Sequence, residues 1–285
     1  MAHPLVSVVI PTYNRTRTLV RAINSCIQQS YDLIEVVVVD DHSPFELNEY
    51  LTHSLGDAAT KVRCVRNSRN VGPGASRNIG IDNSSGEYIC FLDSDDEFSK
   101  DKVLLQLAAI EETEADFCYC GWQWVDERSG RVLRTRNVRD GRIHKKKRWG
   151  HNVVQDLMVN ARCLEDVRFK PYRTFENYDF VIRLFNNYKP TYVSRVLVTC
   201  YEHQNERASD LYASNIQVLR DTLSRHEDLI RSEDRQTYWE LCVKIGVLSC
   251  ANGNKLRAIP YFIKALRNLK QSPRTIRHCI KAALS

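Results

Sequence analysis

The run from Leu33 to Val39 constrains the fold more than any other part of the chain. It is almost wholly apolar, it is rich in β-branched residues, and it stops at Asp40-Asp41. A continuous apolar run of this length is typical of a strand buried on both faces, and such strands occur mainly in parallel sheets that helices cover on both sides. The sequence therefore predicts an α/β fold.

Strand and helix patterns alternate on either side of this run, through Ile110. We expect strands at 5–10, 61–66 and 87–92, and helices at 16–27, 45–55, 74–82 and 99–110. In the last of these helices we expect Ser99 to be the cap and Lys102 to face solvent. The alternation predicts a doubly wound sheet, in which the loops after successive parallel strands lie along one edge.

The pattern changes after Asp116. We expect a strand at 117–125, a charged hairpin or loop at 126–141, a helix at 176–184, a strand at 192–201, and only helices from about Ser209, including 215–229, 236–250 and 255–269. The resulting domain prediction is an α/β domain over residues 1–208 and a helical C-terminal extension over residues 209–285.

The formal charge of +6 is unevenly placed, with a basic run from Arg142 to Arg148. This run favours anionic partners such as phosphates or a membrane surface, and it leaves nucleic acid as an alternative. No apolar stretch approaches the roughly 20 residues that span a bilayer, so any membrane contact is expected to be peripheral.

The ten cysteines lack the spacing of zinc sites, and several of them, such as Cys90 and Cys118, lie among apolar residues. No secretory signal pattern precedes Leu5. We therefore expect reduced core cysteines and a cytoplasmic protein, with the inner face of the cell membrane as a second possible location.

Polar groups follow three of the predicted strands, at the edge where ligands of parallel sheets bind. They are Pro11 to Asn14, Asp40-Asp41, and Asp93 to Asp96. Each group alone is compatible with a turn or a helix cap, but their placement on one edge favours a ligand site. Asp93 and Asp95 are suited to hold a hard cation through oxygen ligands.

Four segments carry a resemblance to a known family: Val8 to Arg15, Val38 to Ser43, Asn70 to Gly80, and Phe91 to Asp96. In this order and spacing they resemble family 2 glycosyltransferases, over residues 5 to about 205. The resemblance implies a GT-A fold, with a mixed sheet flanked by helices, and the transfer of a sugar from a nucleotide diphosphate donor with inversion at the anomeric carbon.

The resemblance also implies site residues. Donor-binding residues would be Pro11, Thr12, Tyr13, Asp40, Asp41, Asn70, Arg77, Asp93 and Arg207. The family's DxD motif matches Asp93-Ser94-Asp95, so that Asp95, with Asp93 and His203 as further ligands, would hold Mn²⁺ or Mg²⁺. His42 stands where the family usually has glycine, which leaves the choice between Asp40 and Asp41 open.

The general base is the weakest part of the match. Many members place an aspartate after a glutamate at the start of a helix, but here Asn177 follows Glu176. An amide cannot take a proton near neutral pH, so Glu176 or Asp179 would be the base. A catalytically impaired relative that only binds nucleotide sugars is the alternative.

We therefore expect an inverting, metal-dependent glycosyltransferase of the hexosyltransferase type. Its donor would be a nucleotide sugar, most simply a UDP-sugar, and its acceptor a glycan, a lipid-linked sugar or a cell-surface polysaccharide. The acidic sheet edge argues against nucleic acid as a partner, because without a metal it repels phosphates. The helical extension is expected to serve acceptor binding, peripheral membrane contact or homodimer formation.

Overall fold

The computed structural model describes residues 3–138, 153–172, 176–202, 212–233 and 235–267. These residues form two compact units. The first contains the described residues up to 171 together with 183–202, and the second contains 172, 176–182 and the described residues from 212 onward. The boundary predicted at residue 208 lies outside the described residues and stays a prediction.

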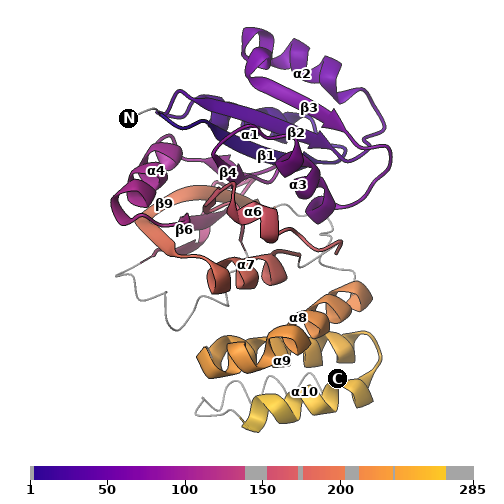
Figure 1. The fold of residues 1–285 in the computed structure, drawn as a ribbon. Coiled ribbons are helices and arrows are strands. Elements are labelled where there is room, and N and C mark those ends of the chain that lie inside the picture. The colour runs from indigo at the N-terminus through magenta and orange to yellow at the C-terminus, as the bar shows by residue number, and fades with distance from the viewer. Residues whose placement is uncertain (1–2, 139–152, 173–175, 203–211, 234, 268–285) are drawn as a thin grey trace. The chain divides into compact units, whose positions relative to one another are not determined.

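The first unit is built on one curled, mixed sheet (Figure 1). Its described strands are β1 (Val6–Thr12), β2 (Ile34–Asp40), β3 (Val62–Arg66), β4 (Tyr88–Phe91), β5 (Glu97–Phe98), β6 (Phe117–Asp126), β7 (Val132–Arg136), β8 (Leu157–Asn160) and β9 (Pro190–Glu202). The spatial order is β3-β2-β1-β4-β8-β6-β9-β5, and β7 pairs with β6. The first four strands in this order are parallel, whereas β8 is antiparallel to both of its neighbours.

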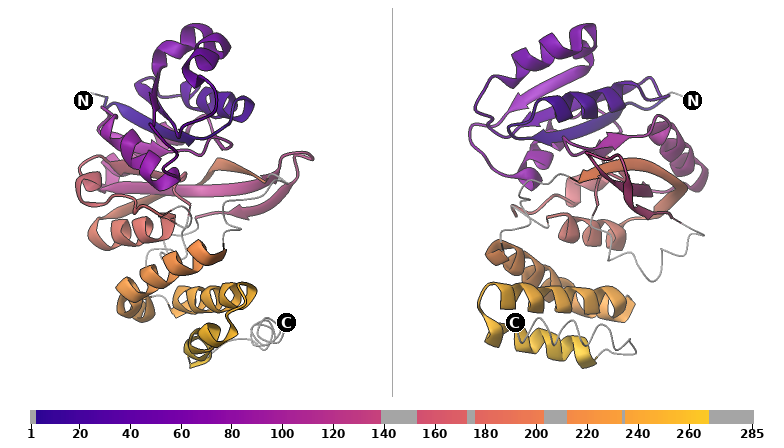
Figure 2. Two further views of the ribbon diagram at one scale, coloured as in Figure 1. Left: turned by 90° about the vertical axis from the view of Figure 1, so that its right-hand side faces the viewer. Right: turned by 180° about the vertical axis from the view of Figure 1, so that it is seen from behind.

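Helices cover both faces of the sheet (Figures 1 and 2). The helical segments of this unit are α1 (Arg17–Ile27), α2 (Leu47–Leu55), the 3₁₀ helix η1 (Gly56–Lys61), α3 (Pro73–Asp82), α4 (Lys102–Thr113), α6 (Cys163–Asp166) and the second half of α7 (Glu176–Asn187). Leu19 and Ile23 of α1 pack in one core with Val8 of β1. Gly80 of α3 lies against Val9, whose side chain points to the opposite face. The predicted doubly wound α/β fold is therefore confirmed.

Two details of the predicted fourth helix are wrong. The helix begins at Lys102, and Asp101 is its N-cap residue. Lys102 is fully buried, and its Nζ donates to Gln106 Oε1 at 2.7 Å and to the carbonyl of Leu157 at 3.3 Å. An ammonium group can be buried when acceptors meet it, and here they come from α4 and from the antiparallel strand β8, which the sequence pattern did not reveal.

The second unit is helical. It contains α8 (Tyr212–Glu233), α9 (Arg235–Ala251), α10 (Lys255–Arg267) and the first half of α7. Its core gathers apolar residues from α7, α8, α9 and α10, namely Ile182, Ile216, Leu219, Leu223, Ile230, Tyr238, Leu241, Cys242, Ile245 and Ala265. The expected C-terminal helical extension is therefore present.

The cysteines in the described parts of the chain are free thiols, and most of them are buried. Burial raises the pKa of Cys26 and of Cys118 to about 12. This agrees with the expected core cysteines. Within the described ranges, no helix combines the length and the apolar content needed to cross a bilayer.

Candidate active site

The loops that follow β1, β2 and β4 meet at one edge of the sheet. The backbone N–H of Asn14 donates to Ser43 Oγ at 2.9 Å, which joins the first loop to the second. Arg15 reaches the third loop, where its guanidinium lies 3.0 Å from Asp95 Oδ2. The gathering of polar groups that the strand pattern predicted is thus present in the structure.

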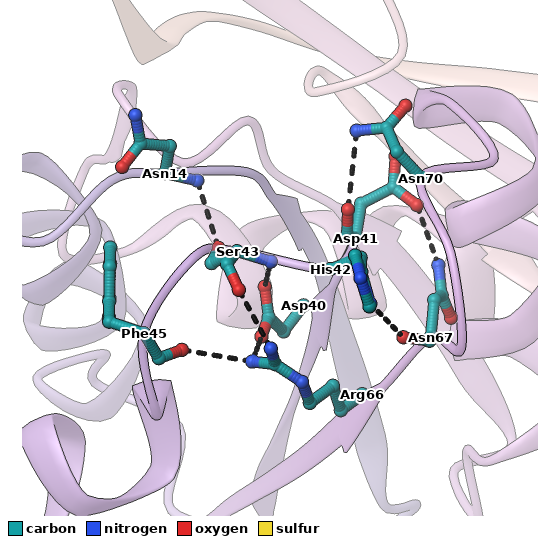
Figure 3. Close-up of polar contacts among 9 residues, drawn as sticks. All are labelled: Asn14, Asp40, Asp41, His42, Ser43, Phe45, Arg66, Asn67 and Asn70. Atoms are coloured by element: carbon teal, nitrogen blue, oxygen red, sulfur yellow. Dashed lines mark hydrogen bonds and ion pairs between the residues drawn. The ribbon is translucent and has the colours of Figure 1, made fainter.

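Asp40 holds the turn after β2 (Figure 3). Its buried carboxylate accepts a hydrogen bond from the backbone N–H of Ser43 at 2.9 Å. It also pairs with Arg66 of β3 at 2.6 Å, and Arg66 in turn donates to the carbonyl of Phe45. These contacts give Asp40 a structural task, which is to close the turn and to neutralise Arg66.

Asp41 fixes the segment between β3 and α3. Its Oδ1 accepts hydrogen bonds from Asn67 Nδ2 at 2.9 Å and from the Val71 backbone N–H at 2.8 Å, and its Oδ2 accepts from the Gly72 N–H at 2.8 Å. Asn70, a predicted donor-binding residue, donates to the Asp41 carbonyl at 3.2 Å (Figure 3). Asp41 and Asn70 therefore shape the loop that enters α3.

His42 adopts a left-handed backbone conformation, with a φ of 69°. Glycine reaches this region without strain, which explains why a glycine would suit the position. The imidazole Nδ1 lies 3.2 Å from the Asn67 carbonyl, a contact that glycine cannot make (Figure 3). The loop thus keeps a glycine-like backbone while carrying a side chain.

Pro11 and Thr12 are buried at the end of β1, whereas Tyr13 has an exposed fraction of 53%. Asn14, the next residue, is also left-handed, with a φ of 52°. An exposed aromatic ring next to a fixed turn is suited to stack on a flat ligand group. Of these three predicted donor-binding residues, Tyr13 offers the most accessible surface.

Arg77 is almost fully buried in α3, with an exposed fraction of 2%. Its Nη2 lies 2.6 Å from Asp93 Oδ1, and its guanidinium stands over the ring of Phe169 at 5.3 Å. The structure therefore brings together two predicted site residues, Arg77 and Asp93. In this arrangement the arginine orients the carboxylate and balances part of its charge.

Gln155 is a site residue that the sequence pattern missed. It lies just before β8 and is buried, and its Nε2 is 2.5 Å from Asp93 Oδ2 and 3.0 Å from Asp96 Oδ2. The backbone N–H of Val154 donates to its Oε1. The sequence signal is a pair of polar residues, Gln155-Asp156, inside an apolar run, and this does not indicate a partner far along the chain.

The acidic loop after β4 concentrates negative charge. Burial, followed by the nearby carboxylates of Asp95 and Asp93, raises the pKa of Asp96 well above its usual range. Arg21 of α1 donates to the backbone carbonyl of Asp95 at 2.6 Å and lies over the ring of Tyr201 at 3.9 Å. Cationic side chains and one glutamine amide thus hold the loop in place.

The donor set of this loop fits a hard divalent cation. The Asp93 and Asp95 side chains remain 34% and 19% exposed, and their oxygen atoms are the ligand type that Mn²⁺ and Mg²⁺ prefer. Among the described residues, no three His, Cys, Asp or Glu side chains converge as a metal-binding group. An ion held here would therefore rely on further ligands such as donor phosphates or water.

The two candidate bases lie in the first half of α7, within the second unit. Asp179 is fully buried, and its Oδ1 lies 2.8 Å from Arg225 Nη1 and 3.3 Å from His226 Nε2. Glu176 is also buried but retains some exposed surface. His203 and Arg207, the remaining predicted residues, lie outside the described part of the chain.

Comparison with known proteins gives a family for this chain. Residues 7–165 match the glycosyl transferase family 2 profile. An uncharacterized glycosyltransferase of Rickettsia felis is 39% identical over 125 residues, which cover 43% of this chain and 20% of that protein. The amylovoran biosynthesis glycosyltransferase AmsB of Erwinia amylovora is 37% identical over 110 residues, which cover 38% of this chain and 36% of that protein.

The chain thus matches only about a fifth of the length of the Rickettsia felis relative and of those from Rickettsia bellii and Rickettsia conorii. A longer match, 25% identical, covers 78% of this chain and 76% of an uncharacterized glycosyltransferase of Haemophilus influenzae. Among solved structures, residues 1–349 of S. aureus TarS in complex with UDP-GlcNAc share the fold, with a TM-score of 0.65 and 19% identity. That comparison covers 93% of this chain and 89% of the TarS chain.

Proposed function

The chain belongs to glycosyltransferase family 2, and from that premise we propose that it transfers a single sugar, with inversion, from a nucleotide diphosphate sugar to a glycan acceptor. A UDP-sugar is the proposed donor, since TarS, which shares the fold, was solved with UDP-GlcNAc and with UDP. The name of AmsB, an amylovoran biosynthesis glycosyltransferase, supports a polysaccharide acceptor.

The observation that carries the proposal is the meeting of three loops at one sheet edge. Tyr13, on the first loop, exposes a ring that can stack on the nucleobase. Asp93 and Asp95, on the third, offer oxygen atoms at the same edge. Asp40 and Asp41 shape the second loop through their internal hydrogen bonds, so we assign their part in donor binding mainly to backbone positioning.

Inverting transfer forms a bond from an acceptor oxygen to the anomeric carbon while the bond to the diphosphate breaks. A divalent cation held by Asp93 and Asp95 would supply charge neutralisation for the departing diphosphate. The acceptor hydroxyl must lose its proton to a base on the opposite face of the sugar. We propose Glu176 for this task, because it is the carboxylate directly before Asn177 and retains some exposed surface, whereas the Asp179 carboxylate is fully buried.

A second candidate function rests on Asn177, which stands where many family members carry the base. In this alternative the chain binds nucleotide sugars without transferring them. The donor edge would be the same in both cases. The two functions differ only in turnover.

The test is nucleotide release from a panel of UDP-GlcNAc, UDP-glucose, UDP-galactose and GDP-mannose in the presence of Mn²⁺. We expect release from one UDP-sugar to fall at least about 100-fold in Asp95→Asn, because charge stabilisation of the leaving group is removed. Asp57→Asn is the matched control, since Asp57 is an exposed carboxylate in η1. Equal activity of Asp95→Asn and the parent chain would contradict the role of the acidic loop.

The base assignment is tested in the same assay by Glu176→Gln and Asp179→Asn. We expect the first to lose activity while donor affinity is kept. Full activity of Glu176→Gln would overturn the assignment of Glu176. Donor binding without release, in the parent chain and with every acceptor tested, would instead favour the non-catalytic alternative.

A further inference from the structure

Helix α10 exposes an apolar stripe. Leu256, Ile259, Ile263 and Leu266 follow one another at intervals of three and four residues, which places them on one side of the helix. Their exposed fractions range from 42% at Ile263 to 81% at Leu256. Single exposed aliphatic residues are common, but four aligned on one helix form a surface that suits an apolar partner.

An adjacent side of α10 is packed against α9, and this packing leaves the stripe exposed. Ala258 and Phe262 are buried against Val243 and Val247 of α9. The contact is close, because a Cβ added to Gly246 of α9 would lie 2.5 Å from a ring carbon of Phe262. Glycine at this position lets the two helices approach, and the approach fixes the rotation of α10 about its axis.

An ion pair fixes α10 from a second direction. Lys264 Nζ lies 2.9 Å from both carboxylate oxygens of Glu227 in α8. Tyr238 of α9 donates to the same carboxylate at 2.8 Å. The three helices are therefore tied together, and the stripe does not depend on a loosely held helix.

Cationic side chains flank the stripe. Lys255, Arg257 and Arg267 are exposed, and the helix from Lys255 to Arg267 contains no acidic residue. On a helical projection Lys255 borders the apolar arc on one side and Arg267 borders it on the other, and Arg257 lies further round beyond Arg267. An apolar face with basic flanks is the pattern of helices that lie in the interface of an anionic membrane.

We propose that this face of α10, defined by Leu256, Ile259, Ile263 and Leu266, is a docking surface for an anionic lipid bilayer. The charges favour lipid over a second copy of the chain, because a two-fold interface would place each basic flank near its own counterpart. An anionic bilayer matches both the apolar stripe and the basic residues beside it, because its acyl region can bury the aliphatic side chains and its headgroups attract the cations. The surface would hold the protein beside lipid-borne molecules.

The test is cosedimentation of the full chain with vesicles of phosphatidylcholine alone and with vesicles that contain about one third phosphatidylglycerol. We expect binding to the anionic vesicles that weakens as salt is raised. Ile259→Asp/Ile263→Asp should lower the partition coefficient at least about tenfold, because it removes two inserted side chains and adds two repelled charges. Leu104→Asp is the control, since Leu104 is 44% exposed on α4.

A second variant keeps the test valid if the first fails to fold. Lys255→Ala/Arg257→Ala/Arg267→Ala leaves the apolar stripe intact, and it should also lower binding at least about tenfold. The proposal is overturned if the parent chain does not bind anionic vesicles, or binds both vesicle types equally. It is also overturned if light scattering shows a dimer that Ile259→Asp/Ile263→Asp dissociates, because the stripe would then serve a second copy.

Discussion

At the scale of single residues, the carboxylates of Asp40 and Asp41 are committed to the protein itself. Asp40 pairs with Arg66, and Asp41 accepts hydrogen bonds from one side chain and two backbone N–H groups. Such bonds order the loops that surround a ligand. If a variant of either residue loses donor binding, its free energy of unfolding must also be measured, because the loss can come from a disordered loop.

For Asp41→Asn we expect a loss of about 1–3 kcal/mol in the free energy of unfolding, because the amide replaces an acceptor oxygen with a donor that faces backbone N–H groups. Denaturant unfolding followed by circular dichroism measures this loss. The control is Asp57→Asn at an exposed position. An Asp41→Asn variant as stable as its parent would show that these hydrogen bonds contribute little.

Residue types alone predicted some of these roles and missed others. The acidic loop could be predicted, because polar groups follow three strands whose ends lie along one edge of the sheet. Gln155 could not, since its role depends on two carboxylates about 60 positions away in the chain. The internal hydrogen bonds of Asp41 were also hidden, because the sequence does not reveal how the segment before α3 turns back.

At the scale of elements, α3 is pressed against the sheet at Gly80. A Cβ at this position would lie 2.3 Å from Val9 Cγ1 and 3.2 Å from Val39 Cγ2. Val9 lies on β1 and Val39 lies on β2. Neither strand can move away easily, because each is paired with a neighbouring strand on both sides. The close packing of α3 places Arg77, on the same helix, beside Asp93.

We expect Gly80→Ala to lower the free energy of unfolding by about 1–3 kcal/mol through overpacking. The clash is mainly with the side chain of Val9, so the cost of Gly80→Ala should depend on that side chain. In a double-mutant cycle with Val9→Ala, the cost of Gly80→Ala should shrink by about 1 kcal/mol or more. Additive costs would mean that the strain lies elsewhere than at the contact with Val9.

Helix α9 carries a lysine whose charge is disfavoured in the folded protein. Burial lowers the pKa of Lys244 to about 8, although the nearby Glu240 opposes the shift. Between about pH 8 and the ordinary lysine pKa of about 10.4 the unfolded chain binds more protons than the folded one. Stability therefore rises with pH across this window through Lys244.

We expect Lys244→Met to be more stable than the parent chain at pH 7.5, by up to about 3 kcal/mol. The advantage should shrink as the pH approaches 10. Denaturant unfolding at both pH values measures it, and Lys255→Met, at an exposed lysine, is the control. A difference that does not change with pH would rule out titration of Lys244 as its cause.

The pattern of apolar residues predicted the regular elements because burial imposes a period on each of them. The pairing of short strands that lie far apart in the sequence leaves no periodic pattern of apolar residues. Strands β5 and β8 are short, and β8 joins the sheet antiparallel between β4 and β6. Lys102 was expected in solvent for the same reason, since its partner Leu157 lies on β8.

At the scale of the whole molecule, the first unit carries the acidic edge and the second carries the candidate bases and the α10 stripe. The sequence predicted a sheet followed by helices, but it did not predict that residues 176–182 belong to the helical unit. That assignment depends on Ile182 and Tyr178, which pack into the core formed with α8 and α9. In the sequence these two residues cannot be told apart from other apolar residues of a helix.

The central claim is that the sheet edge binds a nucleoside diphosphate through a divalent cation held by the acidic loop. Titration calorimetry of UDP, with Mn²⁺ and with a chelator, tests it most directly. We expect the parent chain and Asp57→Asn to bind UDP at least about tenfold more tightly with Mn²⁺, and Asp95→Asn to lose that difference. Equal UDP affinity with and without Mn²⁺, or an Asp95→Asn variant that keeps the full Mn²⁺ effect, would contradict the account.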